Sequence, residues 1–415
     1  MDPELSPPAP EAPRPFRRRV LYIPGYDPIP PRRYRELYRR EGVAQAAISG
    51  YGLDFTARKD RTGFGWGVAG DFEGQRTYTE YEVLLWSDIV QTSMGRSIPA
   101  TYLQLCRTAW LYIASGAFWR LTQLRRGPVI AALYPVVVLI LQLLVAVTLA
   151  LLAALPAGWA AGQIAAPLGW IGAPVFLLVT VLILRLWQRL DGKLFAYYLM
   201  HDYAFTAQNG GAYPPALETR IAQFSIRIAQ VLEGDWDEVL IVGHSSGAYL
   251  AVSVLSDLFR AGAVPEDGPA LSLLTLGHVV PMASFLPRAD RLRGDLRYLS
   301  ARAELSWVDV TAPGDACSFA LCDPVAVSGV APPDQCAPLI LSASFTQTLS
   351  PARQAALRWR WFRLHFQYLC AFDRPRDYDY FAITAGPQTL GARYRGRPHS
   401  PGRMSRPVNT YTSTT

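Results

Sequence analysis

Apolar and polar residues alternate with two different periods in the first part of the chain. Residues 19–25 form a short apolar run that stops at a Pro-Gly pair, the pattern of a buried strand that ends in a loop. Residues 51–57 and 77–86 alternate in polarity, which indicates two further strands. Residues 31–48 carry apolar side chains at helical spacing, so we predict a helix between the first two strands.

The middle of the chain is a long uncharged segment. Residues 127–184 contain no Asp, Glu, Lys or Arg. Two apolar runs, at about residues 128–155 and 168–187, match the roughly 20 residues that a helix needs to cross a bilayer core. A Pro-Ala-Gly sequence at 156–158 and the small residues that follow it separate them, because proline and glycine disfavour a continuous helix. The pattern predicts a two-helix transmembrane hairpin, preceded by an amphipathic helix that begins at Ser97.

Strand and helix patterns alternate after the hairpin. A helical pattern at residues 215–233 precedes the apolar, β-branched run 237–242, and another helical pattern follows at 248–259. Residues 271–276 and 305–310 are two more candidate strands. This rhythm predicts an α/β fold with a mostly parallel sheet, which the membrane hairpin interrupts in the sequence.

The chain therefore divides into five segments. A Pro-rich leader without an apolar stretch is expected to be disordered and is no signal peptide, and a basic tail is also expected to be disordered. The segments are 1–17 for the leader, 18–96 for the first part of the α/β domain, 97–200 for the amphipathic helix and hairpin, 201–392 for the second part of the α/β domain, and 393–415 for the tail.

The distribution of charge indicates a membrane protein and argues against a nucleic-acid-binding one. Only 18% of the residues are charged, against about 25% in a typical soluble domain. Although the net charge is +7, arginines gather just outside both outer ends of the hairpin, and the turn between its helices has none. These arginines are Arg125, Arg126, Arg185 and Arg189. The positive-inside rule then places both ends, and with them the α/β domain, on the cytoplasmic side.

Cysteine usage indicates neither a metal centre nor a disulfide framework. The chain has five cysteines, and their spacing includes no CxxC pair and no zinc-ligand pattern. We therefore expect free thiols in a reducing compartment. No metal and no organic cofactor is expected.

One motif carries the candidate chemistry. Gly243-His244-Ser245-Ser246-Gly247 stands directly between a predicted strand and a predicted helix. A serine at such a sharp strand-to-helix turn has its Oγ exposed above the sheet, and the flanking glycines leave room for the tight backbone. Ser245 is the candidate nucleophile, and the backbone N–H of Ser246 is the first candidate donor to an oxyanion.

The order of the residues that follow resembles a known family. A Thr-Leu-Gly sequence at 275–277 comes about thirty residues after the motif, a later strand leads to Gly314 and Asp315, and His365 lies in a His-aromatic stretch near the C-terminus. This order resembles the α/β-hydrolase superfamily of serine hydrolases and, loosely, the fungal-type triacylglycerol lipases. The resemblance implies a catalytic serine, acid and histidine in that chain order.

Three histidines follow the candidate nucleophile: His278, His365 and His399. His278 comes directly after a strand and before any candidate acid loop, and His399 lies in the basic tail. His365 has apolar neighbours on both sides that can hold its ring. We predict that His365 is the general base.

The acid that orients this histidine is predicted from its place after a strand. Asp315 follows the strand at residues 305–310 through a short loop, at the carboxyl end where such sheets carry their sites. Asp309, inside the strand, and Asp323, farther along the chain, remain alternative acids.

The second oxyanion donor is expected in the loop after an early strand. The Pro-Gly pair that ends the first strand is followed by Tyr26, and we assign this role to the Tyr26 backbone N–H. The expected activity is hydrolysis of an acyl ester, with membrane lipids or membrane-dissolved esters as substrates. A catalytically silent membrane scaffold, or an acyltransferase or thioesterase that uses the same triad, remains an alternative.

Overall fold

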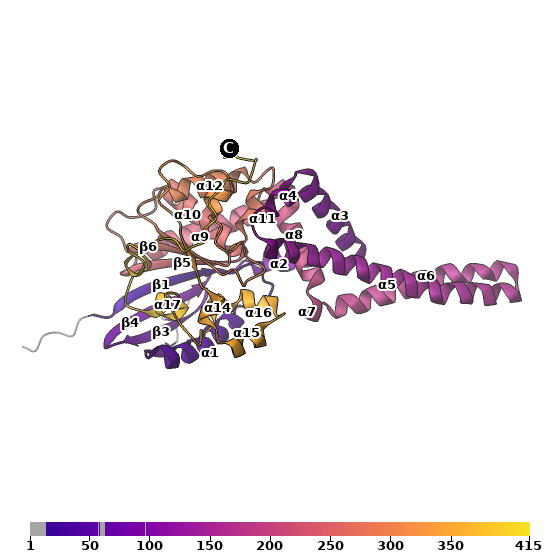
Figure 1. Ribbon diagram of the computed structural model, residues 1–415, viewed down its shortest axis with the longest axis horizontal. Helices are drawn as coiled ribbons and strands as arrows, with labels where there is room; N and C mark the ends of the chain where they lie inside the picture. Colours follow the sequence, from indigo (N-terminus) through magenta and orange to yellow (C-terminus); the bar gives the residue numbers. More distant parts are fainter. Residues whose placement is uncertain (1–13, 57, 59–62, 96) are drawn as a thin grey trace, which may run out of the picture.

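The computed structural model describes residues 14–56, 58, 63–95 and 97–415, and Figure 1 shows a mixed α/β domain from which one pair of helices projects. The predicted leader lies outside the described residues up to position 13. Eight strands form one sheet in the order β2-β3-β4-β1-β5-β6-β7-β8. The segments before and after the projecting helices therefore build a single sheet.

The sheet is mostly parallel, as the sequence predicts. The strands are β1 Phe16–Ile23, β2 Gly52–Thr56, β3 Phe64–Phe72, β4 Gln75–Val83, β5 Glu238–His244, β6 Ala270–Leu276, β7 Ser306–Thr311 and β8 Leu339–Ser342. Among the strand pairs in the described part of the chain, only β2–β3 and β3–β4 are antiparallel. Two strands were not predicted: β3 has glycine at positions 65, 67 and 70, which weakens its strand pattern, and β8 has only four residues.

Helices cover both faces of the sheet. Successive side chains of β5 point to opposite faces, so they contact different helices. The longer helices of the domain are α1 Arg32–Ser49, α2 Ser87–Met94, α9 Pro215–Leu232, α10 Ser246–Arg260 and α12 Asp290–Ser300. The shorter helices are α11 Val280–Ser284, α13 Pro324–Val327, α14 Phe345–Thr348, α15 Pro351–Leu357, α16 Trp361–His365, α17 Tyr380–Ala385 and α18 Leu390–Arg393. Val239 and Ile241 pack with α9, α10 and α12, whereas Leu240 and Val242 pack with α1 and α17.

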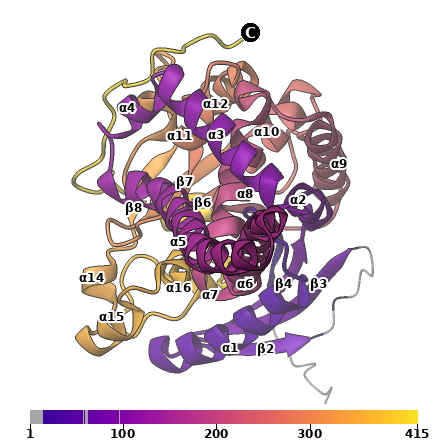
Figure 2. The same ribbon diagram turned by 90° about the vertical axis from the view of Figure 1, so that its right-hand side faces the viewer.

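The segment between α2 and α9 forms a helical layer and the projecting pair, as Figures 1 and 2 show. Its helices are α3 Ile98–Ala114, α4 Ala117–Leu121, α5 Arg126–Ile164, α6 Gly172–Arg189, α7 Asp191–Leu194 and α8 Ala196–Ala207. The helix expected from Ser97 onward ends at Ala114 because Gly116 adopts a left-handed φ of 74°. The base of α5 packs against α8 and shares an apolar cluster with α3, and the Tyr102 hydroxyl of α3 donates to the Leu139 carbonyl of α5 at 2.9 Å.

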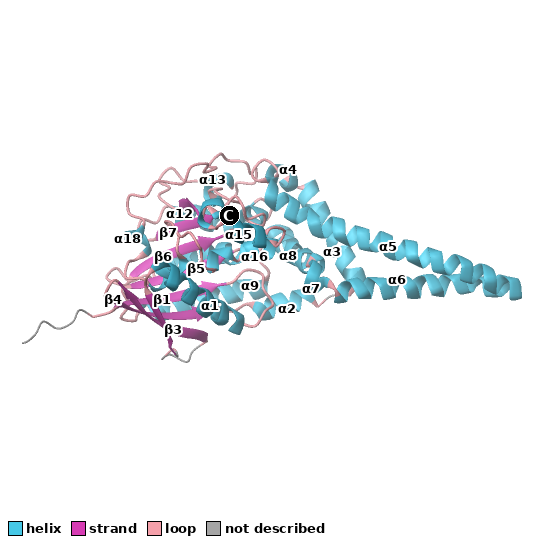
Figure 3. Ribbon diagram, turned by 60° about the horizontal axis from the view of Figure 1, so that its bottom comes forward, coloured by secondary structure: helices cyan, strands magenta, loops and turns pink. Residues whose placement is uncertain are grey.

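Both apolar runs are helical, and α5 and α6 are long and apolar enough to cross a membrane. The predicted break between the two runs is present, but it lies near the end of the expected interval, because α5 continues through Pro156 to Ile164 and the chain turns only at Ala165. A proline removes one hydrogen bond from a helix, and packing of a neighbouring helix can offset that loss. Figure 3 shows α6 running beside the outer part of α5, away from the domain.

Small residues explain the close packing of this pair. Ala146, Ala150, Ala154 and Gly158 recur at every fourth position of α5 and form one stripe, and the three alanines are buried. A Cβ on Gly158 would lie only 2.9 Å from the Gly169 carbonyl oxygen, so the backbones approach closely there. This spacing is typical of helix pairs inside membranes.

The C-terminal segment differs from the expectation. Residues 393–415, predicted as a disordered tail, lie against the domain: the Ser400 N–H donates to the Ile340 carbonyl at 2.9 Å, and the buried Asn409 amide donates to the Ser284 carbonyl at 2.9 Å. The prediction rested on composition, since a Gly-, Arg- and Pro-rich segment forms no core of its own. Such a segment can still be ordered when its backbone forms hydrogen bonds with a strand, here β8.

Candidate active site

Ser245 occupies the sharp turn between β5 and α10. Its backbone has φ 57° and ψ −121°, a conformation that L-residues rarely adopt, and its N–H donates to the Leu276 carbonyl at 2.9 Å. His244 and Ser246 on either side are buried, whereas Ser245 is only half-buried. The turn therefore exposes the Ser245 side chain and hides its neighbours, as the motif predicts.

The two flanking glycines are required by close backbone contacts. A Cβ on Gly247 would lie 2.1 Å from the Ile23 carbonyl oxygen, and a Cβ on Gly243 would lie 2.6 Å from the Gly247 carbonyl oxygen. No side chain fits at these distances. The first glycine contact also brings the end of β1 directly beside the turn.

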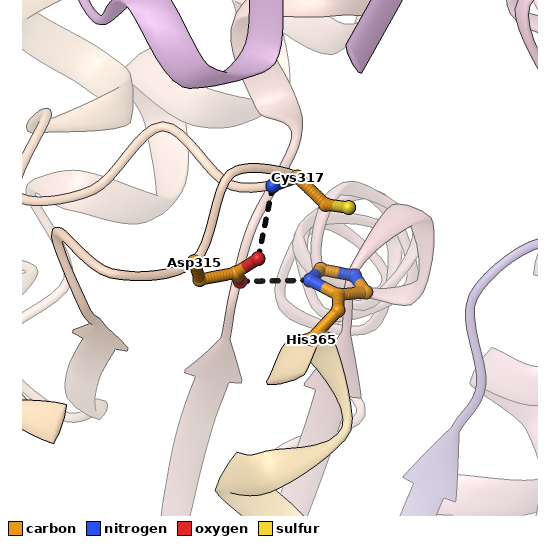
Figure 4. Close-up of side chains that lie close together, drawn as sticks. All are labelled: Asp315, Cys317 and His365. Carbon is orange, nitrogen blue, oxygen red and sulfur yellow. Dashed lines mark hydrogen bonds and ion pairs between the residues drawn. The ribbon is translucent and has the colours of Figure 1, made fainter. Parts of the chain in front are cut away.

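A buried histidine–carboxylate pair lies beside this turn. The His365 Nδ1 is 2.8 Å from Oδ2 of Asp315, as Figure 4 shows, and both residues are buried. His365 closes α16, and Asp315 lies in the loop after β7. The Cys317 N–H donates to Asp315 Oδ1 at 2.9 Å, and the Tyr368 hydroxyl donates to Oδ2 at 3.1 Å. Both carboxylate oxygens are therefore held in place.

These contacts determine the charge of the carboxylate. Burial by itself would raise the pKa of Asp315, but the neighbouring His365 ring and the donors around it outweigh burial and lower this pKa below its usual value. Asp315 is therefore ionised at neutral pH. It accepts the Nδ1 proton of His365, which leaves Nε2 as the free base or acid of the ring.

One small cavity, of about 60 Å³, connects the serine and the histidine. Ser245 and His365 both line it, and so do Tyr26 and Ser246, whose backbone N–H groups are the two predicted oxyanion donors. The four residues come from four different places in the chain: the turn after β1, the strand–helix turn, the start of α10 and the end of α16. The structure thus brings together the residues that the sequence predicts, with Asp315 behind the ring.

The alternative acids have other partners. Asp309 accepts a hydrogen bond from the Thr275 hydroxyl at 2.6 Å, and His278 lies 3.7 Å from its other oxygen. Asp323 accepts two backbone N–H groups at the start of α13 and pairs with Arg403 at 2.5 Å. Neither carboxylate contacts His365, so both act within the core of the fold.

His399 also has a structural position. Its Nδ1 accepts the N–H of Ile340 at 3.0 Å, which ties the C-terminal segment to β8. Neither His278 nor His399 lines the cavity of Ser245.

His244 packs against the ring of His365, and sequence reasoning did not assign it a role. Its ring centroid lies 4.8 Å from that of His365, and its Nε2 is 3.0 Å from the His365 carbonyl oxygen. Burial, with a further effect from the nearby His365, lowers the pKa of His244 to about 3. The ring is therefore neutral, and it donates through Nε2 because a carbonyl oxygen can only accept.

Asp202, on α8, is a second site residue that sequence reasoning missed. It lines the cavity of Ser245, and burial raises its pKa to about 7, although the nearby His365 acts in the opposite direction. No local motif marks it, because it reaches the site only when the end of the inserted segment folds over the sheet.

Three groups in this site could also hold a metal ion. Ligand atoms of Asp315, Cys317 and His365 lie within 4.8 Å of one another. A thiolate, an imidazole and a carboxylate form a donor set that zinc accepts. Burial raises the pKa of the Cys317 thiol well above its usual value, and the adjacent Asp315 raises it further, so the thiol is protonated here. The hydrogen bond between Asp315 and His365 therefore fits a catalytic triad better than it fits a metal site.

Comparison of the chain with protein-family models, curated proteins and solved structures gives no match. The arrangement of these side chains is therefore the basis for assigning a function.

Proposed function

We propose that this protein is a membrane-anchored serine hydrolase of α/β-hydrolase type, which cleaves an acyl ester through Ser245, His365 and Asp315. The observation that carries the proposal is the buried 2.8 Å contact between His365 and Asp315, beside a cavity that Ser245 shares. A nucleophile, a base and an orienting carboxylate from distant parts of the chain are the three parts that ester hydrolysis by serine requires.

The reaction follows from these positions. Ser245 Oγ attacks the ester carbonyl while Nε2 of His365 takes its proton, and the N–H groups of Ser246 and Tyr26 stabilise the oxyanion. His365 then gives that proton to the departing alcohol, which leaves an acyl group on Ser245. A water molecule attacks this acyl-enzyme, His365 takes its proton, and the proton returns to Ser245 as the carboxylic acid leaves. Asp315 keeps the ring oriented and stabilises its charged form.

The surrounding fold supports the same proposal. Tyr26, Ser245 and Asp315 follow the carboxyl ends of β1, β5 and β7, where the turns of a parallel sheet meet at one edge. A strained serine turn between a buried strand and a helix is also the signature of the α/β-hydrolase superfamily. The family assignment is part of the proposal and rests on this local geometry.

We further propose that α5 and α6 cross a bilayer and that the catalytic domain lies on its cytoplasmic side. Arginines flank the two helices where they join the domain, and the far turn has none. Trp159 and Trp170, near this turn, are 71% and 81% exposed, and tryptophan is enriched at membrane–water interfaces. An enzyme anchored in this way meets membrane-dissolved esters at high local concentration.

Labelling with a fluorophosphonate probe tests the proposed chemistry. The full-length chain in detergent is expected to react, whereas Ser245→Ala and His365→Ala are expected to lose the label. Ser405→Ala, at an exposed serine of the C-terminal segment, is the control and should label like the parent. Undiminished labelling of Ser245→Ala would disprove the assignment, and an unreactive parent chain would favour the silent scaffold. Product analysis with an added alcohol acceptor separates hydrolysis from acyl transfer.

A further inference from the structure

A second, apolar cavity lies next to the cavity of Ser245. It has a volume of about 240 Å³ and is enclosed by α3, α4, the base of α5 and α8. Its walls include Ala109, Tyr112, Phe118, Ala132, Val136 and Met200. The Tyr112 hydroxyl donates to the Met282 carbonyl at 2.8 Å, so this polar group is already satisfied. The cavity is therefore suited to a hydrocarbon ligand.

The two cavities share a wall. Tyr203 and Met282 line both of them, and Pro128 of the catalytic cavity is followed directly by Val129 of the apolar one. A ligand that moved these two shared side chains aside would extend from Ser245 into the apolar space. Together the two volumes approach the lower end of the roughly 300–1,000 Å³ that is typical of small-molecule sites.

The apolar cavity also lies where the domain meets the projecting helices. Leu133 on α5 and Trp119 on α4 line it, and they are 41% and 59% exposed. Figure 2, a view along the projecting helices, places α3 and α4 beside the base of α5. With α5 and α6 in a bilayer, this side of the domain faces the membrane surface. A hydrocarbon chain can then pass between the lipid and the cavity without crossing open water.

We propose that this cavity binds the long acyl chain of a membrane lipid ester while the ester carbonyl is held at Ser245. The proposal rests on the proposed hydrolase function and adds the substrate class. Tyr203 and Met282 form the passage, and Ala109 and Ala132 are the small residues that leave the cavity open. Each methylene buried there improves binding by about fourfold, so long chains are favoured over short ones.

Two esters and two cavity-filling variants test the proposal. We would measure kcat/KM of the full-length chain in detergent for p-nitrophenyl butyrate and p-nitrophenyl palmitate. Ala109→Trp and Ala132→Trp are expected to lower the palmitate value by at least tenfold and to leave the butyrate value within about twofold of the parent. Ala114→Trp, at an exposed position of α3 outside the cavity, is the matched control and should change neither value.

Each outcome separates this proposal from the function on which it rests. Equal losses for both esters, or no loss for palmitate, would overturn the acyl-chain site and leave the hydrolase intact. A parent chain with butyrate activity that Ser245→Ala abolishes, but with no preference for palmitate, would also overturn it. No turnover of either ester by the parent would count against the hydrolase itself. If a tryptophan variant fails to react with fluorophosphonate, Ala132→Leu replaces it, because leucine fills less of the cavity. This variant is expected to lower kcat/KM for palmitate by a smaller factor and to leave the butyrate value unchanged.

Discussion

The backbone of Gly25 lies against the side chain of Ser245. A Cβ added to Gly25 would come within 2.9 Å of Ser245 Cβ and 3.3 Å of its Oγ. The end of the first strand and the serine turn are more than two hundred residues apart in sequence, yet they form one contact in the site. A substitution of Gly25 therefore tests the site without changing any of the proposed catalytic side chains.

Gly25→Ala is expected to reduce the rate of fluorophosphonate labelling by at least tenfold, because the added methyl group displaces the Ser245 side chain. Gly192→Ala is the matched control, since a Cβ there meets nothing within 4 Å. Labelling rates and melting temperatures of both variants check the prediction. Normal labelling of Gly25→Ala would show that the contact between the two residues does not constrain the nucleophile.

Asp315→Asn is expected to lower kcat/KM for a short ester by about 10⁴-fold, because an amide cannot hold the His365 ring in the required tautomer. Asp323→Asn keeps an oxygen that can cap α13 but replaces the one that accepts from Arg403 and Gln335 with an amide nitrogen, so it should lower the melting temperature and leave kcat/KM of the folded protein near the parent value. Kinetics and thermal unfolding of the two variants compare these acids directly. A larger catalytic loss for Asp323→Asn would move the acid to that residue.

Asp202 is expected to make the protein less stable as pH rises toward neutrality. Burial raises its folded-state pKa to about 7, against about 3.9 for an unfolded chain, so between these values the folded state holds a proton that the unfolded state has lost. Stability from this group is therefore fully present near pH 4 and is lost as pH rises to about 7. The melting temperature of Asp202→Asn, minus that of the parent, should increase over this range. A difference that stays constant with pH would show that Asp202 has an ordinary pKa.

The proposed orientation of the hairpin predicts which cysteines a membrane-impermeant maleimide can reach. Cys106 and Cys336 are exposed on the domain, and both should stay unlabelled in intact cells and become labelled after permeabilisation. Ala165→Cys places a thiol at the exposed far turn and should react in intact cells. Labelling of Cys336 in intact cells, with no reaction at position 165, would reverse the orientation.

Local patterns in the sequence predicted much of the candidate site. The serine motif is visible because strand, turn and helix are adjacent in the chain, so Ser245 and Ser246 can be recognised without any distant contact. Asp315 and His365 followed from their chain order after the serine and from their neighbours. The structure places His365 at the cavity of Ser245 with Asp315 bound to its ring, and it separates Asp309 and Asp323 from the ring.

Hydrophobic periodicity alone determined that this chain has an α/β domain with two long apolar helices inserted in it, because period and run length are properties of consecutive residues. Only the tertiary structure decided the order of the strands, the ordered path of residues 393–415, and the approach of Gly25, His244 and Asp202 to the catalytic groups. These features depend on contacts between residues far apart in the chain. Such contacts produce no periodic pattern in the sequence, because each of the two residues has the local surroundings of an ordinary loop, strand or helix.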